Sequence, residues 1–344
     1  MEEVAQDPVL DMRERGNLKE IIVSPGRKLE GHYTLMTEHV CPVGALTSKD
    51  FRFKARVWFF RTANSVCQGC ATGCNAHLDY DPRYNKAYRY RPRENASVNQ
   101  FWMCDEGMLS YGRAHEGRVT EARVGAKAVP MAQALEEAKK MLGSVPKGGV
   151  AVVLSAQHSL EDNWGFKELA GLLGAKAVYV TGGPKEGYAD KILIHADKNA
   201  NSAGVALLAP EAKDWASFVA DVKSGAVTHA IALGGITPKG DAEASALGNL
   251  KGLVTVAAHE GALTKAARVV LPAASWAESA GTFVNAKGHF QTADKAIEAQ
   301  GSSEPAWALA AALGKTLGLS AQWSKLKEVR TKLPVAPAQS SAAT

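Results

Sequence analysis

Short apolar runs alternate with segments of helical spacing along the C-terminal two thirds of the chain. The apolar runs predict strands at 149–154, 177–180, 204–208, 228–233, 253–256 and 268–271. Apolar residues three or four positions apart predict helices at 131–142, 159–172, 215–222, 242–247 and 305–317. Continuously apolar strands separated by helices are typical of a parallel sheet with both faces covered. The pattern therefore predicts the fold class α/β, with a doubly wound parallel sheet.

The N-terminal third has a different pattern. Charged and apolar side chains alternate over residues 51–60, which predicts a half-buried strand, and the same period of two predicts a second strand at Lys86–Arg91. We therefore expect a small β-rich domain there. Before it, a short helical pattern at Met1–Gln6 is followed by turn-forming Gly and Pro residues. At the other end, a Pro/Ala/Ser-rich tail over 331–344 is expected to be disordered.

The composition is that of an ordinary globular protein. Hydrophobic residues make up 46% and charged residues 22% of the 344 positions. No apolar run approaches the roughly 20 residues that span a bilayer, and the acidic N-terminus is unlike a signal peptide. We therefore expect a soluble protein without direct membrane insertion. The net charge of +5 is small and no nucleic-acid motif is present, so no nucleic-acid partner is expected.

Positive charge is concentrated between residues 51 and 93. Only two acidic residues, Asp79 and Asp81, stand there against nine basic residues: Arg52, Lys54, Arg56, Arg61, Arg83, Lys86, Arg89, Arg91 and Arg93. Cations beside a thiolate-bound metal cluster stabilise its negative charge and raise its reduction potential. The alternative interpretation is a surface that faces solvent or another subunit.

Four of the five cysteines follow a spacing that suits a metal cluster. Cys67, Cys70 and Cys74 form a C-x2-C-x3-C run, and Cys104 follows after 29 further residues. A tight loop can cover three corners of a compact cube while a distant thiol covers the fourth. The spacing therefore predicts a [4Fe-4S] cluster on these four residues.

Two other chemistries fit clustered cysteines. Disulfides are disfavoured, because a chain of this length can bury a core without them and nothing marks it as secreted. Structural zinc is the stronger alternative, although zinc sites usually pair two CxxC knuckles or use two Cys and two His ligands. The fifth cysteine, Cys41, precedes Pro42, as does the last ligand of ferredoxin-type clusters, but its three partners are missing from the sequence.

Three stretches of the chain together resemble one family. They are Cys41-Pro-Val-Gly-Ala-Leu to Trp58, the cysteine run from Ser65 to Asn75, and Arg91-Pro-Arg-Glu-Asn95 followed by Trp102-Met-Cys-Asp-Glu-Gly107. They are similar to the G subunit of bacterial NADH-quinone oxidoreductase, the counterpart of the 75 kDa subunit of respiratory complex I. The resemblance implies that Cys67, Cys70, Cys74 and Cys104 bind a [4Fe-4S] cluster, in a domain shared with molybdopterin oxidoreductases. In the family this cluster lies off the main electron route.

The resemblance also gives Cys41 a role and reveals a difference. The matching cysteine in the family is the last ligand of another [4Fe-4S] cluster, whose other ligands lie upstream in a CxxCxxC run. The family's N-terminal [2Fe-2S] domain and its His/Cys cluster site have no counterpart in this sequence. Met1-Glu-Glu-Val4 resembles the residues that follow the CxxC run, so we expect a truncated reading frame, a misassigned start or a split subunit. A second cluster would then form only if upstream ligands are supplied.

A further resemblance lies in the predicted α/β part. It is to a molybdopterin-oxidoreductase signature, on Leu271-Pro272, Glu278, Gly281-Thr282, Asn285, Gly288 and Gln291. In molybdenum enzymes this region helps to hold a pterin dinucleotide. No cysteine follows Cys104 to ligate the metal, and an α/β part of about 200 residues is shorter than two pterins require. We therefore expect no molybdenum cofactor and interpret the signature as a retained element of the fold.

Glycine pairs after predicted strands mark where a parallel sheet could bind a ligand. Gly234-Gly235 is the better candidate, and Gly182-Gly183 is the other. Neither belongs to a GxGxxG or GxxxxGK motif, so the sequence supports no NAD or flavin site.

These observations divide the chain into a remnant of an upstream iron–sulfur domain (1–60), a [4Fe-4S] domain (61–118), a molybdopterin-oxidoreductase-like α/β domain (119–330) and the tail. The hypothesis is an electron-transfer subunit without catalytic residues of its own, in the peripheral arm of NADH-quinone oxidoreductase, on the cytoplasmic side of the inner membrane. Its partners would be the other subunits. The alternatives are a fragment of a molybdopterin-dependent oxidoreductase such as formate dehydrogenase, and a zinc-stabilised interaction module.

Overall fold

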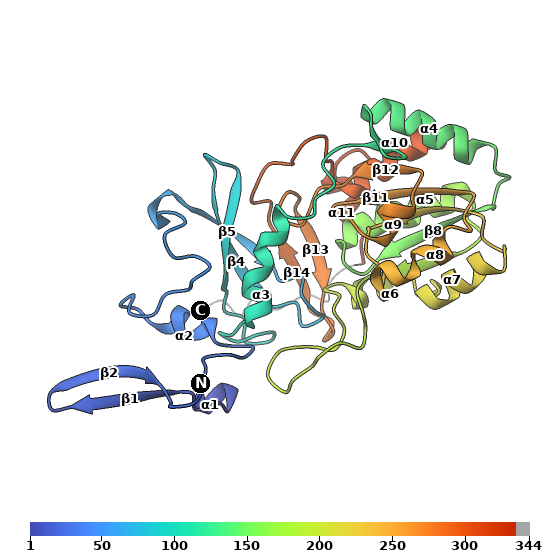
Figure 1. The fold of residues 1–344 in the computed structure, drawn as a ribbon. Helices are drawn as coiled ribbons and strands as arrows, with labels where there is room; N and C mark the ends of the chain where they lie inside the picture. Colours follow the sequence, from blue (N-terminus) through green and yellow to red (C-terminus); the bar gives the residue numbers. More distant parts are fainter. Residues whose placement is uncertain (335–344) are drawn as a thin grey trace.

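The computed structural model describes residues 1–334, so most of the predicted tail lies outside the described residues. A seven-stranded sheet with its helices forms one end of the molecule, a three-stranded sheet lies beside it, and an N-terminal hairpin projects at the far end (Figure 1). Within residues 1–334, no helix is both long enough and apolar enough to cross a membrane.

The N-terminal region consists of short, exposed elements. They are α1 (Glu2–Ala5), β1 (Leu10–Arg15), β2 (Leu18–Val23) and α2 (Leu35–Val40). The predicted opening helix is present as α1, whereas the antiparallel hairpin β1–β2 was not predicted. Its turn is formed at Gly16, whose φ of 62° favours glycine.

The strand predicted at 51–60 is wrong. Turns occupy residues 49–54, Val57–Phe59 is a single 3-10 turn (η1), and the strand begins only at Arg61. The apolar side chains of the alternating pattern have no core to face, since Phe53 is 90% exposed. An alternating pattern predicts which side chains would share a face of a strand, but it does not show that a neighbouring strand is present for pairing.

The small sheet is antiparallel, in the order β3-β4-β5. Its strands are β3 (Arg61–Val66), β4 (Asn75–Asp81) and β5 (Lys86–Pro92), the last of which confirms the strand predicted at Lys86–Arg91. Helix α3 (Asp105–Leu109) and the 3-10 segment η2 (Ser110–Ala114) pack against β5. Leu78, Tyr90 and Met103 are fully buried in the core beneath the sheet, together with Cys67 and Cys74.

The large sheet has the order β7-β6-β12-β11-β10-β8-β9. Its strands are β6 (Arg123–Val124), β7 (Lys127–Ala128), β8 (Val150–Ser155), β9 (Val178–Thr181), β10 (His229–Leu233), β11 (Gly252–Ala257) and β12 (Val269–Pro272). The strands from β8 to β12 are parallel, and β6 and β7 extend the sheet in antiparallel pairing. Because β8 lies between β9 and β10, the strand order reverses at β8, which creates a switch point.

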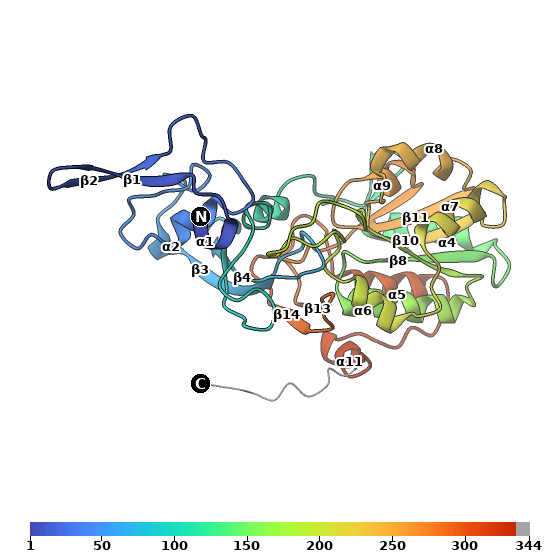
Figure 2. The same cartoon turned by 90° about the horizontal axis from the view of Figure 1, so that it is seen from below.

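Helices cover both faces of the large sheet (Figure 2). One core contains α4 (Met131–Gly143), α5 (Leu160–Leu173), α6 (Ser202–Leu208) and α10 (Ala306–Thr316); the other contains α7 (Trp215–Lys223), α8 (Ala244–Leu247) and α9 (Ala262–Ala266). Along β8, Val150, Val152 and Leu154 enter the first core, and Ala151 and Val153 enter the second. The predicted doubly wound α/β fold is confirmed. The short segments η3 (Gly240–Glu243) and α11 (Leu326–Arg330) are the remaining helical elements of residues 1–334.

The strand predicted at 204–208 is also wrong, because these residues form most of α6. Val205 and Leu208, three positions apart, are buried, while Leu207 between them is 51% exposed. That spacing is helical. A five-residue apolar run is too short to distinguish a buried strand from a buried helix by composition.

A second hairpin connects the two sheets. Strands β13 (Gly281–Val284) and β14 (Phe290–Ala293) pair antiparallel and come from the signature region noted in the sequence. Directly after β14, the backbone N–H of Asp294 donates a hydrogen bond of 2.8 Å to the carbonyl of Asn64 in β3. The hairpin therefore places the signature residues against the loop that carries three of the cysteines.

Candidate metal centre

The structure brings the four predicted cysteines together. Cys67 follows β3, Cys70 and Cys74 lie in the loop before β4, and Cys104 immediately precedes α3. A Cβ atom placed on Gly107 would stand 3.2 Å from the Cys67 sulfur and 3.3 Å from the Cys104 sulfur. The two cysteine segments therefore meet at this glycine of α3.

The four thiols lie close enough for their charges to act on one another. Burial raises the pKa of Cys74 well above its usual value, and the charges of Cys67, Cys70 and Cys104 raise it further. Burial, followed by the charge of Cys70, raises the pKa of Cys67 to about 12. Neutral thiols are therefore favoured in the absence of a counter-charge. Metal ions supply that charge and deprotonate the thiols that bind them.

Backbone donors point at two of the sulfurs. The N–H of Gly69 donates to the Cys67 sulfur over 3.4 Å, and the N–H of Gly107 donates to the Cys104 sulfur over 3.3 Å. Hydrogen bonds of this kind stabilise thiolates bound to iron and tune the potential of the cluster. The donor set and its surroundings fit an iron–sulfur cluster.

Within residues 1–334 the cysteines are not paired as disulfides and do not form a ready-made site for one metal ion. In the described part of the chain, no three His, Cys, Asp or Glu side chains are grouped so that they could hold one ion. Structural zinc requires four donors about 2.3 Å from one point, whereas each iron of a [4Fe-4S] cube takes its own thiolate. All five cysteines are free.

The hairpin β13–β14 holds the cysteine loop by its carbonyl groups. The side-chain amide of Asn285 donates to the carbonyl of Thr72 over 3.1 Å, and that of Gln291 donates to the carbonyl of Gly73 over 2.9 Å. The backbone N–H of Ala286 donates to the carbonyl of Ala71 over 2.8 Å. The sequence singled out Asn285 and Gln291 as part of a retained fold element. It did not show that they contact the cysteine loop.

Arg113 is a residue near the cysteines that the sequence did not identify. Its guanidinium is largely buried, which lowers its pKa, and the charges that act on it are those of Cys67 and Tyr90. By contrast, Arg89 and Arg91 of the basic stretch pair with Asp79, at 2.8 and 2.7 Å. Arg113 stands outside the stretch of residues 51–93 in which cations were sought, and no sequence motif marks it.

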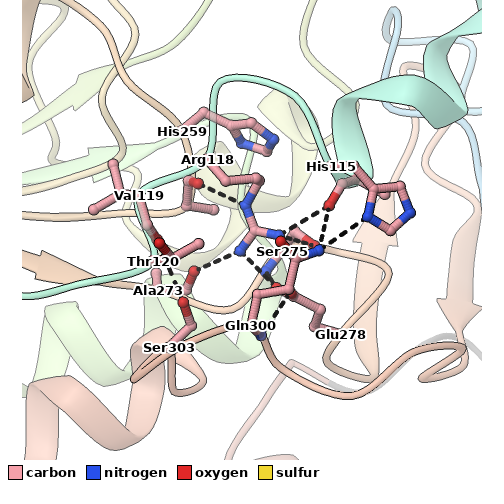
Figure 3. A network of polar contacts seen from close by, with 12 residues as sticks. His115, Arg118, Val119, Thr120, His259, Ala273, Ser275, Glu278, Gln300 and Ser303 are labelled. Atoms are coloured by element: carbon pink, nitrogen blue, oxygen red, sulfur yellow. Dashed lines mark hydrogen bonds and ion pairs between the residues drawn. The ribbon is translucent and has the colours of Figure 1, made fainter. Parts of the chain in front are cut away.

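A buried ion pair joins the cysteine region, which ends just after η2, to the segment that follows β12 of the large sheet (Figure 3). The Arg118 guanidinium contacts Glu278 at 2.6 Å, and the two side chains are 2% and 0% exposed. Arg118 also donates to backbone carbonyls, and Glu278 also accepts hydrogen bonds from the N–H groups of Ser275 and Gln300. The pair anchors the end of the cysteine region to the segment that follows β12.

Cys41 lies outside the group of four. It is the C-cap of α2, and its thiol faces the peptide N–H groups of its own loop. The N–H of Leu46, helped by those of residues 43–45, lowers the pKa of Cys41. This loop favours a thiolate at Cys41, separate from the thiols around Gly107.

A small cavity of about 50 Å³ occupies the switch point of the large sheet. Gly234-Gly235, Ser155, His158 and His259 line it from the strand ends, and Arg113 lines it from the cysteine region. Gly234-Gly235, the better of the two candidate ligand positions, thus lies at a hollow, but the volume suits only a few water molecules. At Gly182-Gly183, the side chain of Asn199 already bonds both backbone groups of Gly183.

Comparison with known proteins matches two family models to this chain. Residues 60–116 match the molybdopterin oxidoreductase Fe4S4 domain, and residues 128–316 match molybdopterin oxidoreductase. The first match covers all four cysteines around Gly107.

Individual relatives have similar sequences over shorter stretches. The G subunit of NADH-quinone oxidoreductase from Mycobacterium tuberculosis is 36% identical over 110 residues, which are 32% of this chain and 13% of the relative. The G subunit from Streptomyces coelicolor is 29% identical over 176 residues (49% and 20%), and subunit 3 of the Thermus thermophilus enzyme is 31% identical over 173 residues (49% and 22%). The matched part is thus 13–22% of these relatives' lengths. These similarities confirm the resemblance to the G subunit, and because the longer family match spans more than half of its residues, the chain belongs to the molybdopterin oxidoreductase family.

Proposed function

We propose that this chain is an electron-transfer part of an NADH-quinone oxidoreductase and that Cys67, Cys70, Cys74 and Cys104 hold its [4Fe-4S] cluster. The observation that carries the proposal is the meeting of two cysteine segments at Gly107, with backbone N–H groups directed at two of the sulfurs. The Fe4S4-domain match and the similarity to the G subunit support the same function.

A bound [4Fe-4S] cluster takes up and releases one electron at its iron atoms. The residues of the chain provide its surroundings. Cys67, Cys70 and Cys74 are buried, so bulk water is kept from three of the sulfurs. Arg113 contributes a cation beside Cys67, which favours the more negative, reduced state. No residue of the chain is assigned to making or breaking a substrate bond.

We extend the proposal to the other cofactors. Cys41 would ligate a second [4Fe-4S] cluster only when three further ligands are supplied, and its loop of N–H donors suits a thiolate. A molybdenum cofactor is not expected. The cavity of about 50 Å³ is far below the roughly 300–1,000 Å³ of typical ligand pockets, and no cysteine follows Cys104.

The proposed partners are the other subunits of the oxidoreductase. The proposed place is its peripheral arm, on the cytoplasmic side of the inner membrane. The similarity to the G subunit supports both statements.

The test is anaerobic purification of the full chain, with iron and sulfide analysis and electron paramagnetic resonance of the reduced protein. We expect about four iron atoms and four sulfides per chain and one paramagnetic centre. Cys70→Ser should lose the iron, because it removes a corner ligand. Cys41→Ser is the matched control, and it should keep the iron and the spectrum.

Three results would contradict the proposal. Stoichiometric zinc without iron would establish a zinc-stabilised module. Stoichiometric molybdenum or tungsten would establish a fragment of a molybdopterin enzyme such as formate dehydrogenase. About eight iron atoms with two centres, reduced to four by Cys41→Ser, would show that Cys41 holds a cluster without added ligands.

A further inference from the structure

Residues 51–61 and 82–89 form an exposed group of arginine and aromatic side chains, which we call the Arg–aromatic surface. Phe53, Trp58 and Tyr84 are 90%, 70% and 68% exposed, and Phe59 is 43% exposed. Single exposed apolar residues are common on soluble proteins, whereas a contiguous group marks an interaction site. The first segment leads into β3 and the second includes the start of β5, so both lie at the three-stranded sheet, away from the helices of the large sheet (Figure 1).

Arg83 joins the two segments into one surface. Its guanidinium carbon lies 3.6 Å from the ring centre of Phe59 and 5.3 Å from that of Tyr84. Phe60 stacks on Tyr88 with ring centres 5.1 Å apart, which holds the first segment against β5. Phe59 and Phe60 of the first segment therefore lie beside Tyr84 and Tyr88 of the second, although the two segments are more than 20 residues apart in the sequence.

The surface carries most of the excess charge of the molecule. Its seven cations are Arg52, Lys54, Arg56, Arg61, Arg83, Lys86 and Arg89; its two segments contain no Asp or Glu, and the carboxylates that flank them in the sequence are Asp50, Asp79 and Asp81. Asp79 and Asp81 are buried and already paired with arginines. Seven cations set against these three carboxylates leave a surplus of four positive charges, compared with a net charge of +5 for the whole chain. A partner must therefore present negative charge.

Phe53 is held in a strained backbone conformation. Its φ of 64° is unusual for a bulky residue. Such strain costs about 1–3 kcal/mol and is concentrated at functional and binding positions. The strain at Phe53 and the exposure of its ring are both explained if a partner covers the ring.

Guanidinium groups occupy faces of the exposed rings. Arg56 lies 5.7 Å from the ring of Trp58, and Arg52 lies 4.6 Å from the ring of Phe53. Nucleic-acid bases need free ring faces on which to stack, and rings that enter a bilayer would carry these charges into the lipid. Stacked arginines instead present pre-oriented donors to carboxylates. Arginine and aromatic residues are also the ones enriched at the centres of protein interfaces.

We propose that the Arg–aromatic surface docks another protein through a face where Asp and Glu side chains surround an apolar patch. The surface contains none of the five cysteines, so the proposal does not depend on the metal that they hold. The proposal therefore goes beyond electron transfer and identifies which side of the chain meets a partner.

Site-specific photocross-linking of the full chain in the cells that produce it tests the proposal. A p-benzoylphenylalanine replaces Trp58, and in a control it replaces Leu207 of α6, which is 51% exposed. We expect a cross-link from position 58, but not from position 207, to a peptide of a second protein within an Asp/Glu-rich face. The triple variant Arg52→Glu/Arg56→Glu/Arg61→Glu should lower the yield at least about tenfold, because three attractions become repulsions. The control Lys139→Glu/Lys147→Glu, on the far side of the large sheet, should not.

The opposite outcomes overturn the proposal. They are an adduct with lipid or nucleic acid, no adduct at position 58, or a yield that the triple charge reversal leaves unchanged. Purified protein should also fail to bind vesicles rich in anionic phospholipid and a single-stranded oligonucleotide. Iron content measured on the same variants should stay at the wild-type level, so failure of the docking surface and failure of the metal centre give different results.

Discussion

The buried pair Arg118–Glu278 should be the most consequential ion pair for stability among those that the structure describes. Every N–H group of the Arg118 guanidinium donates a hydrogen bond. The acceptors are the side chains of Glu278 and Ser275 and the carbonyls of residues 114, 258 and 273. The carboxylate in turn accepts from two backbone N–H groups. Removal of either side chain therefore leaves a charge in the interior without its counter-charge.

The expected magnitude follows from the burial. Breaking a buried pair by removing one partner costs about 3–5 kcal/mol, because the remaining charge stays desolvated. That is a large share of the roughly 5–15 kcal/mol that separates folded from unfolded domains. Arg118→Met and Glu278→Gln should each cost this amount. The double variant should cost at least about 1.5 kcal/mol less than the sum, because the neutral amide at position 278 no longer needs a cation.

Urea unfolding followed by tryptophan fluorescence measures this coupling in a double-mutant cycle. The control is Lys140–Glu137 on α4, where the nitrogen–oxygen distance is 3.7 Å and the side chains are 74% and 31% exposed. Lys140→Met/Glu137→Gln should give a coupling of about 0.2–0.5 kcal/mol. If the Arg118–Glu278 coupling were as small as that of the control, burial would not be what determines the strength of this pair.

Three further predictions concern the metal centre and its surroundings. Gly107→Ala should destabilise the protein by about 1–3 kcal/mol and lower its iron content, because the new Cβ stands 3.2 Å from the Cys67 sulfur. The control is Gly171→Ala, which should retain the iron because no atom lies within 4 Å of its new Cβ. Gln291→Glu should weaken iron retention about tenfold, because it removes the donor to the cysteine loop; the measurement is iron loss to a chelator. Burial lowers the pKa of His158 from 6.5 to about 4, so the unfolded state binds its proton first and stability falls as pH drops from 6.5 towards 4. In urea titrations, His158→Gln should remove up to about 1.4 kcal/mol per pH unit from that slope.

Each of these has a clear contrary result. Equal iron in the Gly107 and Gly171 variants would show that the sulfurs can move aside. Equal chelation rates in Gln291→Glu and in the exposed α4 variant Gln133→Glu would show that the hairpin does not hold the cysteine loop. Parallel stability curves for wild type and His158→Gln between pH 4 and 6.5 would show that His158 is protonated in the folded protein.

The local pattern of the sequence predicted the large sheet, and it singled out the four cysteines as one group. Every residue of β8 is buried, so the run Val150–Leu154 is apolar on both faces and identifies a covered parallel strand. The cysteine spacing is a local feature as well. The errors arose where local pattern depends on tertiary partners: residues 51–60 alternate without a neighbouring strand, and the short run 204–208 packs as a helix.

The residues missed at the metal centre are those that reach it from a distance. Asn285 and Gln291 contact the cysteine loop from 213 and 218 residues away in the sequence. Arg113 acts on Cys67 only because η2 packs against β5. No regular spacing in the sequence marks either kind of contact, so the roles of Asn285, Gln291 and Arg113 could be inferred only from the fold.

The same contacts explain what the α/β part contributes. A loop that surrounds a cluster turns N–H groups towards the sulfurs, as Gly69 does, and its carbonyls must find donors elsewhere. In this chain the hairpin β13–β14 supplies donors to three successive carbonyls, from Ala71 to Gly73. Without them, buried carbonyls would lack partners, which costs about 1–3 kcal/mol each. The signature region therefore has a structural purpose: it completes the hydrogen bonding of the cysteine loop.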